Sequence, residues 1–560
     1  MRPTLYGTRH AISAGHYLAA AAGFSILEAG GNAIDAGTAA GLALGVLQPD
    51  LVSVGGVAPI LIRRADGSVE SIAGLGRWPQ TLPPDLFVRE HAGRIPEGVL
   101  RTVTPAAVDA WITALSRHGT FRFADVVAPA IRFAAEGFAI YPLLARSIAA
   151  HADEYRRWPQ NAAVFLPGDR VPAIGTKFVQ AELARTLQFL ADADRAAPDR
   201  LAGLAAARDA FYRGDIAREI AAFQAREGGY LTMQELAAYR SPIEPVVRRR
   251  WRGHEVIVCG PWCQGPALVE ALLLVEQVGI DRLAHNCPDY LHRIVECLNL
   301  ALADREHFFG DPAFVDVPID WLLDPGTIAR RAGAVRDHRA LGAMPPPLDG
   351  HARAPAPSGA ALPKIEADTS YVAVVDRWGN AFSATPSDGA SSVPMVPGLG
   401  MISSGRGSQS RPDPRHPAGV APGKRPRLTP NPAILVTEAG GVMPFGTPGG
   451  DVQIQAMLQV LLNRFYFGME LQEAIDAPRV ASYSFPSSFA PFEYFPGRLA
   501  VEARIDDVTQ AALAVRGHEL QHWPDFTWLA GSVEAVCADP GSGLIAAGAD
   551  PRRPAYAIAI

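Results

Sequence analysis

The chain has 560 residues, of which 48% are hydrophobic and 19% are charged, a balance that excludes a largely disordered protein. Its 51 Lys and Arg and 57 Asp and Glu residues give a formal net charge of −6, which disfavours a nucleic-acid-binding role. The amino terminus lacks the apolar core of a signal peptide, and the apolar stretch 36–47 is too short to span a bilayer. We therefore expect a soluble, cytoplasmic protein that has neither nucleic acid nor membrane as its partner.

The five cysteines are expected to be free thiols. An odd number of cysteines in a long chain argues against a disulfide framework. Cys259 and Cys263 are four residues apart, but no second pair or histidine cluster accompanies them at metal-ligand spacing.

Before residue 344 the sequence predicts mostly helices. Glycine pairs such as Gly30–Gly31 supply helix stop signals, and a glycine-interrupted apolar run predicts a buried strand. The elements expected in this part are, in chain order, helices over 17–29 and 32–48, a strand within 52–62, several helices between 105 and 240, a strand over 254–258, and helices over 266–278 and 288–309.

Residues 344–360 form a compositional break. This stretch contains five prolines and almost no large apolar side chain, so it cannot pack a core and is predicted to be a linker. After it the pattern changes to strands. The elements expected there are two hairpins, over 371–385 and 433–445, and a long helix over 451–467.

One string, residues 518–522, has the His-Glu-x-x-His spacing of helical zinc sites. Gly517 and Pro524 flank it closely and leave room for a short strand instead of a helix. On a strand, His518 and His522 lie roughly 13 Å apart, which is too far to share one ion. We therefore expect no metal site in this string.

Thr369 begins a predicted strand directly after the proline-rich stretch. Threonine is a weak nucleophile at neutral pH unless a base lies beside it. A chain break before Thr369 would supply that base, because a new α-amine has a pKa of roughly 7.7–8.0. The alternative interpretation is an ordinary linker that leads into an ordinary strand.

The segment from Asp368 to Asn380 resembles the start of the small, catalytic subunit in the γ-glutamyltransferase family of amino-terminal-nucleophile hydrolases. In that family a threonine is followed by a short strand, a turn of the Asp-x-x-Gly-Asn type and a second strand. Other segments that are similar to family motifs are residues 28–36, 103–108, 134–138, 303–305, 310–312 and 446–450. They occur in the order found in the family and span nearly the whole chain.

This resemblance implies an α/β (α+β) fold, a four-layered αββα sandwich, made as an inactive precursor that cuts itself between Asp368 and Thr369. Residues 1–368, with a proline-rich tail at 344–368, would form a large fragment, and residues 369–560 a small catalytic one, both intertwined in one domain. The implied partners are these two fragments and a small-molecule amide substrate. No cofactor and no metal are implied, and a homodimer remains open.

The family's catalytic residues carry over onto four positions. Thr369 would be the nucleophile through its hydroxyl group, and Ser387 stands where the family has a second hydroxyl residue that assists it. Gly449 and Gly450 match the glycine pair whose backbone N–H groups form the oxyanion hole. On the sequence alone, Ser387 could equally be a surface turn residue, and the two glycines a tight turn.

The chain departs from the family where γ-glutamyl enzymes bind their substrate. In those enzymes an arginine binds the substrate carboxylate. The corresponding segment of this chain is Leu75–Pro79, in which that arginine is displaced or replaced and Arg77 is the arginine present. Their acidic pair for the substrate α-amine falls in Ser403–Gln409, which has no carboxylate and contains Arg406. A serine pair becomes Leu428–Thr429. Most of the residues that bind the γ-glutamyl group in the family are thus replaced in this chain.

These departures predict the charge of the substrate. A site that loses its acidic amine-binder and gains an arginine disfavours an α-ammonium and favours a carboxylate held by a guanidinium. Arg77, Arg406 and Arg427 are the candidate carboxylate binders, although each could equally be a structural salt-bridge residue. The oxamate amidohydrolase branch of the family has substrates of this kind.

The leading hypothesis is a self-processing hydrolase of amide C–N bonds that acts on a small, oxamate-like amide through an acyl-enzyme on Thr369, with acyl transfer as a further activity. One alternative is a γ-glutamyltransferase or γ-glutamyl hydrolase that acts on glutathione-like compounds. Another is a relative that stays uncut and binds a ligand without catalysis.

Overall fold

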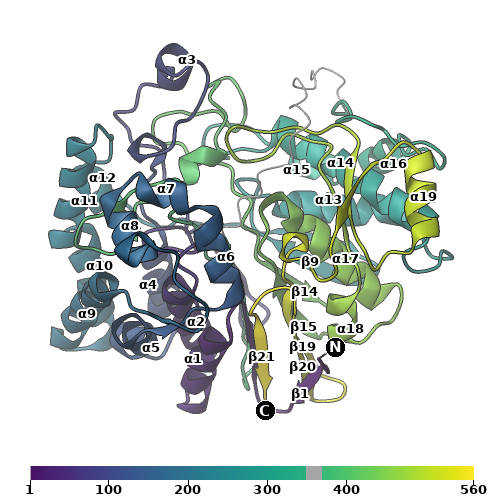
Figure 1. Cartoon of the computed structure of the whole chain (residues 1–560). Helices are drawn as coiled ribbons and strands as arrows, with labels where there is room; N and C mark the ends of the chain where they lie inside the picture. Colours follow the sequence, from purple (N-terminus) through teal and green to yellow (C-terminus); the bar gives the residue numbers. More distant parts are fainter. Residues whose placement is uncertain (1, 349–368) are drawn as a thin grey trace.

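The computed structural model describes residues 2–348 and 369–560 (Figure 1). Residue 1 and residues 349–368 lie outside the described residues, so the predicted cleavage site is described only on its Thr369 side. All five cysteines are unpaired, as expected. No helix among the described residues is long and apolar enough to cross a membrane.

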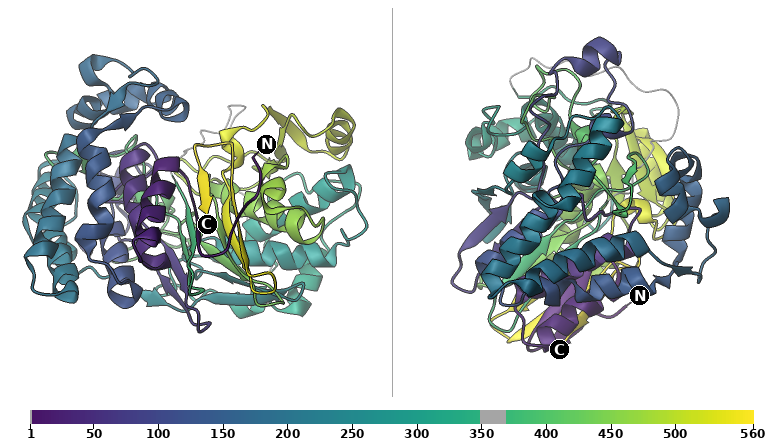
Figure 2. Two further views of the ribbon diagram at one scale, coloured as in Figure 1. Left: turned by 90° about the horizontal axis from the view of Figure 1, so that it is seen from below. Right: turned by 90° about the vertical axis from the view of Figure 1, so that its left-hand side faces the viewer.

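Two seven-stranded sheets form the centre of the molecule (Figures 1 and 2). Sheet A contains, from edge to edge, β1 (Leu5–Gly7), β20 (Leu544–Ala549), β19 (Glu534–Asp539), β15 (Val442–Gly446), β14 (Ala433–Val436), β9 (His254–Val258) and β8 (Val247–Trp251). Sheet B contains β21 (Tyr556–Ala559), β2 (Ala11–Ala14), β10 (Val372–Val375), β11 (Ala381–Ala384), β3 (Ile60–Arg63), β4 (Val69–Ile72) and β7 (Ile243–Glu244). Neighbouring strands in both sheets pair in antiparallel fashion.

Helices cover the outer face of each sheet (Figure 1). On sheet B, α2 (Ala33–Leu47) is buried along its whole length between β10, β11 and α1 (Tyr17–Glu28). On sheet A, α13 (Gly265–Gln277) and α17 (Gln453–Phe465) cover the corresponding outer face. A separate apolar cluster, to which both sheets contribute, lies between the sheets. These layers confirm the predicted αββα sandwich.

Strands that follow residue 369 occupy the centre of both sheets. In sheet B, β10 and β11 stand between β2 and β3, and in sheet A four such strands stand between β1 and β9. The parts of the chain before and after residue 369 are therefore joined by backbone ladders in each sheet. A cut in front of Thr369 would leave both fragments held by these ladders.

The two predicted hairpins and the predicted long helices are present, with ends that differ by a few residues. The strand expected within 52–62 is present only in its last part: Val57 forms an isolated antiparallel bridge with Ser387, β3 begins at Ile60, and turns occupy the residues before Val57. The glycines there allow close backbone contact: a Cβ on Gly55 would lie 2.0 Å from the carbonyl oxygen of Ile402, and one on Gly56 would lie 2.3 Å from that of Ser387. This apolar run is buried because it packs against the segment around Ser387.

Candidate active site

Thr369 lies just before β10, and the register of the hairpin places it opposite Ser387. In the ladder between β10 and β11, Val372 faces Ala384. Thr369, three residues before Val372, and Ser387, three residues after Ala384, form an isolated antiparallel bridge in the same register. The hairpin predicted from the sequence thus determines which two hydroxyl residues meet.

The two hydroxyl groups are hydrogen-bonded to each other. Thr369 Oγ1 lies 2.8 Å from Ser387 Oγ, and both side chains are fully buried. The backbone of Ser387 is fixed by Val57, whose carbonyl accepts the Ser387 N–H at 3.0 Å and whose N–H donates to the Ser387 carbonyl at 3.3 Å. Ser387 is therefore not a surface turn residue, and its hydroxyl is placed to orient that of Thr369.

Arg406 brings a buried positive charge to this pair. It begins a short 3-10 turn (Arg406–Gln409), and its guanidinium donates a hydrogen bond to Ser387 Oγ. Its Nε lies 3.8 Å from Asp388 Oδ2, and its side chain is 1% exposed. Its guanidinium carbon lies 5.6 Å from the centroid of the Phe489 ring. A buried guanidinium in this place is suited to bind an anionic group beside Thr369.

Asp388 supplies a carboxylate to the site that was not among the residues predicted from the sequence. Its φ is 113°, a region that residues other than glycine rarely adopt. The carboxylate accepts hydrogen bonds from the Ser404 hydroxyl and from the N–H of Gly405, the latter at 3.1 Å. These bonds, together with the contact to Arg406, tie the residue after Ser387 to the segment that carries the arginine.

Gly449 and Gly450 lie between β15 and α17, with φ angles of 124° and 57°. A Cβ on Gly446, which ends β15, would lie 2.3 Å from the Tyr371 ring, so this loop leaves sheet A close to the start of β10. Within the described residues, neither backbone N–H of the glycine pair has a hydrogen-bond partner. Both N–H groups are therefore available to stabilise an oxyanion.

Gln264 and Phe489 hold the glycine loop in place. The Gln264 side-chain amide donates to the carbonyl of Gly450 at 3.0 Å, and its oxygen accepts from Arg305 at 3.2 Å. A Cβ on Gly450 would lie 3.2 Å from the Phe489 ring, the same ring that lies next to Arg406. Phe489 thus connects the glycine loop to the arginine. Gln264 and Phe489 stand in no motif of their own, so the sequence does not mark them as site residues.

Arg427 lies in a buried ion cluster around Glu306. It donates to the Glu306 carboxylate at 2.6 Å, and Arg411 pairs with the same carboxylate at 2.6 Å. Although burial acts in the opposite direction, Arg411 and Arg427 hold the pKa of Glu306 well below its usual range. These contacts favour the structural role that the sequence left open for Arg427.

Arg77 is exposed and lies beside the segment that carries Arg406. The next residue, Trp78, packs against Gly407, where a Cβ would lie 2.4 Å from the indole ring. Of the three candidate carboxylate binders, Arg406 is the one whose guanidinium contacts Ser387.

The His-Glu-x-x-His string runs into a strand, as predicted. β18 (Glu519–Trp523) pairs in parallel with β17 (Arg498–Glu502), and His518 directly precedes it. His518 is buried whereas His522 is exposed, so the two rings do not share a site. His518 instead contacts His292 of α14 (Pro288–Phe308).

Comparisons with known proteins agree with this architecture. The gamma-glutamyltranspeptidase family model matches residues 19–560. The Acylase ACY 1 proenzyme of Pseudomonas sp. (strain SE83) is 30% identical over 97% of this chain and 92% of its own. The oxamate amidohydrolase proenzyme of Klebsiella pneumoniae subsp. pneumoniae is 30% identical over 96% of both chains. The solved structure of LmbA2991HD matches with a TM-score of 0.93 and 34% identity, over all of both chains. The chain therefore belongs to the γ-glutamyltranspeptidase family and is an amino-terminal-nucleophile hydrolase of C–N bonds.

Proposed function

We propose that this protein is a self-processing amidohydrolase that uses Thr369 as its amino-terminal nucleophile and hydrolyses small amides whose acyl group carries a carboxylate. One observation carries the proposal: Thr369 Oγ1 lies 2.8 Å from Ser387 Oγ, and the buried guanidinium of Arg406 donates to that same oxygen. These contacts join a nucleophile to an anion-binding group. The similarity to proenzymes supports the self-processing step.

Processing and catalysis use the same hydroxyl group. In the precursor, Thr369 Oγ1 attacks the carbonyl carbon of the preceding peptide bond, the C–N bond breaks, and the acyl group moves to oxygen as an ester. Breaking the C–N bond frees the α-amine of Thr369, and water then hydrolyses the ester, which releases a carboxylate on the first fragment and restores the Thr369 hydroxyl. That amine is the base that the hydroxyl otherwise lacks, because its pKa is roughly 7.7–8.0.

In the processed protein, the α-amine accepts the hydroxyl proton while Thr369 Oγ1 attacks the amide carbonyl of the substrate. The N–H groups of Gly449 and Gly450 stabilise the negative charge that develops on the carbonyl oxygen. The leaving amine departs with the proton, and an acyl-enzyme remains on Thr369. Water then attacks the ester in the same way, and the free acid leaves.

Arg406 selects the acyl group in this proposal. Because its guanidinium contacts the hydroxyl that assists the nucleophile, a carboxylate bound to it has to lie close to the scissile carbonyl. In oxamate the carboxylate is bonded directly to the amide carbonyl, whereas in a γ-glutamyl group it is several bonds away and has an ammonium beside it. An ammonium next to a buried guanidinium is repelled. The similarity to an oxamate amidohydrolase supports this substrate class.

A second candidate, acylase activity on larger amides, has an observation of its own. A cavity of about 650 Å³ is lined by residues 90–97, Arg101 and residues 490–492. The N–H of Ala490 donates to the carbonyl of Ser408 at 2.9 Å, so the cavity wall is joined to the 3-10 turn that begins with Arg406. This volume exceeds what oxamate fills and would accept a bulky acyl or leaving group.

A panel of four substrates distinguishes these functions. It contains oxamate, glutaryl-p-nitroanilide, γ-glutamyl-p-nitroanilide and a glutaryl amide of a bulky bicyclic amine, with kcat/KM as the measurement and Thr369→Ala as the blank. The two anilides differ only by the α-amine, so their ratio reports the effect of the ammonium alone. The proposal requires at least about a tenfold preference for the substrates without an ammonium, or about 1.4 kcal/mol. A preference for the γ-glutamyl anilide would overturn it, and a preference for the bulky amide would favour the acylase function.

A further inference from the structure

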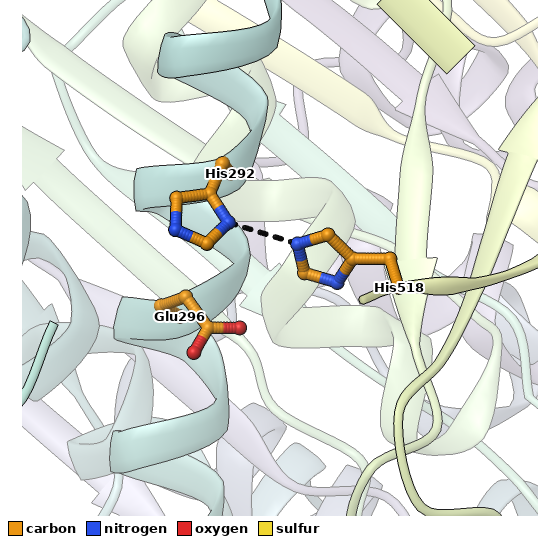
Figure 3. Close-up of side chains that lie close together, drawn as sticks. All are labelled: His292, Glu296 and His518. Carbon is orange, nitrogen blue, oxygen red and sulfur yellow. Dashed lines mark hydrogen bonds between the residues drawn. The ribbon is translucent and has the colours of Figure 1, made fainter. Parts of the chain in front are cut away.

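Two histidines and one glutamate from distant parts of the chain meet between α14 and β18 (Figure 3). His292 and Glu296 are four residues apart on α14 and share one face of the helix. His518 approaches from the turn between α19 (Asp507–Val515) and β18. One nitrogen of each ring and one carboxylate oxygen all lie within 4.8 Å of one another, and His292 Nδ1 is 2.9 Å from His518 Nε2.

Contacts around the cluster orient its donor atoms inward. His292 Nε2 is hydrogen-bonded to the carbonyl oxygen of Arg336 at 2.6 Å. Since a carbonyl can only accept, Nε2 carries the proton and Nδ1 presents a lone pair to the cluster. Glu296 accepts from the N–H of Leu341 at 2.8 Å and from the Asn299 amide at 3.2 Å. Such outer contacts fix the ring and carboxylate orientations in protein metal sites.

The cluster is buried, so an unpaired charge in it costs free energy. The side chains of His292 and Glu296 are fully buried, and that of His518 is 5% exposed. Because His292 Nδ1 accepts in their 2.9 Å contact, His518 Nε2 carries the proton there, and this proton has to shift to Nδ1 of the same ring for Nε2 to bind an ion. Arg516 lies close by, but its guanidinium donates to the carbonyl of Pro288 and to Asp289. A cation among the three donors would compensate a buried Glu296 carboxylate.

We propose that His292, Glu296 and His518 bind a divalent transition-metal ion of the Zn²⁺ class. Two imidazole nitrogens and one carboxylate oxygen form a donor set that Zn²⁺ accepts, and three protein ligands leave a fourth position for solvent. Two nitrogens at about 2.0–2.1 Å from one tetrahedral ion lie about 3.3 Å apart, so the rings need to separate only slightly from their present contact.

The bound ion would fasten the first turns of α14 to the strand that follows His518. The last turns of the same helix carry Arg305, which hydrogen-bonds to Gln264 behind the glycine loop. The site therefore lies outside the active site but on a helix that supports it. His522, the other histidine of the string, lies exposed on β18 and takes no part, which makes it a matched control.

The test is metal uptake by the full chain after dialysis against a chelator. Titration with Zn²⁺ against a chromophoric competitor should show one equivalent per chain, and Co²⁺ should give the visible absorption bands of a four-coordinate ion. Glu296→Gln keeps the shape of the side chain and an acceptor for Leu341, and His518→Ala removes a ligand. Both should weaken Zn²⁺ binding at least about 100-fold, whereas His522→Ala should leave it within about twofold.

Two results would overturn the proposal. The first is a wild-type protein that takes up neither Zn²⁺ nor Co²⁺. This result needs no variant, so it would overturn the proposal even if His518→Ala fails to fold. Equal Zn²⁺ binding in wild type and Glu296→Gln, with loss in His522→Ala, would place the ion elsewhere. A thermal midpoint that rises with added Zn²⁺ in wild type and His522→Ala, but not in Glu296→Gln, would support binding by the folded cluster.

Discussion

Thr369 and Ser387 face each other because a single antiparallel register runs through the β10–β11 hairpin and past its open end. The turn of this hairpin is closed by Asp376, whose carboxylate accepts from the backbone N–H groups of Trp378 and Asn380, both at 2.9 Å. The proposed nucleophile and its hydroxyl partner are therefore placed by local structure. The guanidinium and the glycine pair that complete the site come from more distant parts of the chain.

The first prediction concerns self-processing. Amino-terminal sequencing of the smaller fragment should read Thr-Ser-Tyr-Val, because cleavage frees the amine of Thr369. Thr369→Ala should remain one chain on a denaturing gel and lack amidase activity, since the same hydroxyl is used in both reactions. A normal rate of cleavage in Thr369→Ala, or a fragment that starts at another residue, would remove the proposed nucleophile.

The second prediction concerns Ser387. Ser387→Ala should process more slowly and lower kcat by roughly 5- to 30-fold, the effect of losing one hydrogen bond worth about 1–2 kcal/mol to the nucleophile. Ser370→Ala is the matched control, because the Ser370 hydroxyl lies against Gly15, where a Cβ would be 2.1 Å away. Single-turnover kinetics on the processed proteins is the measurement. Equal effects of both substitutions would mean that the hydroxyl pair has no special role.

The third prediction concerns Arg406. Arg406→Ala should raise KM for a carboxylate-bearing amide by roughly ten- to hundred-fold, since a charged hydrogen bond contributes about 1.5–3 kcal/mol. Arg406→Asp should go further, because it repels an acidic substrate. Of the substrates in the panel, oxamate should show the largest loss, because its carboxylate is bonded directly to the scissile carbonyl. Unchanged kcat/KM in both variants would place Arg406 outside the binding site.

The family resemblance pointed to Thr369 and Ser387, and the structure brings the two hydroxyls together through a hairpin whose turn is recognisable in the sequence. Asp376–Asn380 marks that turn, and the register then follows from the lengths of two short strands. β2 (Ala11–Ala14) was not predicted, because four residues without a turn signal carry little periodicity. The run within 52–62 has the composition of a strand, but its burial comes from close backbone contact with the segment around Ser387.

The roles of the arginines could not be separated by sequence. Arg406 and Arg427 are both almost fully buried, and composition cannot show which carboxylate or hydroxyl each guanidinium contacts. Two contacts separate them: Arg427 pairs with Glu306, more than a hundred positions away, whereas Arg406 donates to Ser387 Oγ. Phe489 and Gln264 escaped prediction for the same reason, since their significance lies in contacts to Gly450.

The fourth prediction uses the Glu306 cluster. Arg427→Met should lower the free energy of unfolding by about 3–5 kcal/mol, because it leaves a buried carboxylate with one fewer partner. KM should stay within about twofold if Arg427 is structural. Arg415→Met is the control, since Arg415 pairs with Asp413 at the surface and should matter little. A raised KM without loss of stability would return Arg427 to the substrate site.

The pH dependence of the same cluster has a definite sign. The folded-state pKa of Glu306 lies below its usual value, so its ion pairs contribute stability that is fully present above the unfolded-state pKa, roughly 4.3. That contribution is lost as the pH falls through the lowered folded value. The difference in unfolding free energy between wild type and Arg427→Met should therefore be largest near pH 7 and shrink at pH 3. A difference that grows on acidification would contradict this assignment.

The last prediction separates the glycine loop from ordinary turn glycines. Gly449→Ala and Gly440→Ala both place a side chain at positive φ, 124° and 85°, with no neighbouring atom closer than 3.5 Å to the added Cβ. Backbone strain should lower the thermal midpoint of both variants. Only Gly449→Ala should also reduce kcat, by about 10²–10³-fold, because the strained loop displaces an N–H donor from the developing oxyanion, while Gly440 lies in the β14–β15 turn. Equal kcat values in the two processed variants would show that the N–H groups of this pair do not stabilise the transition state.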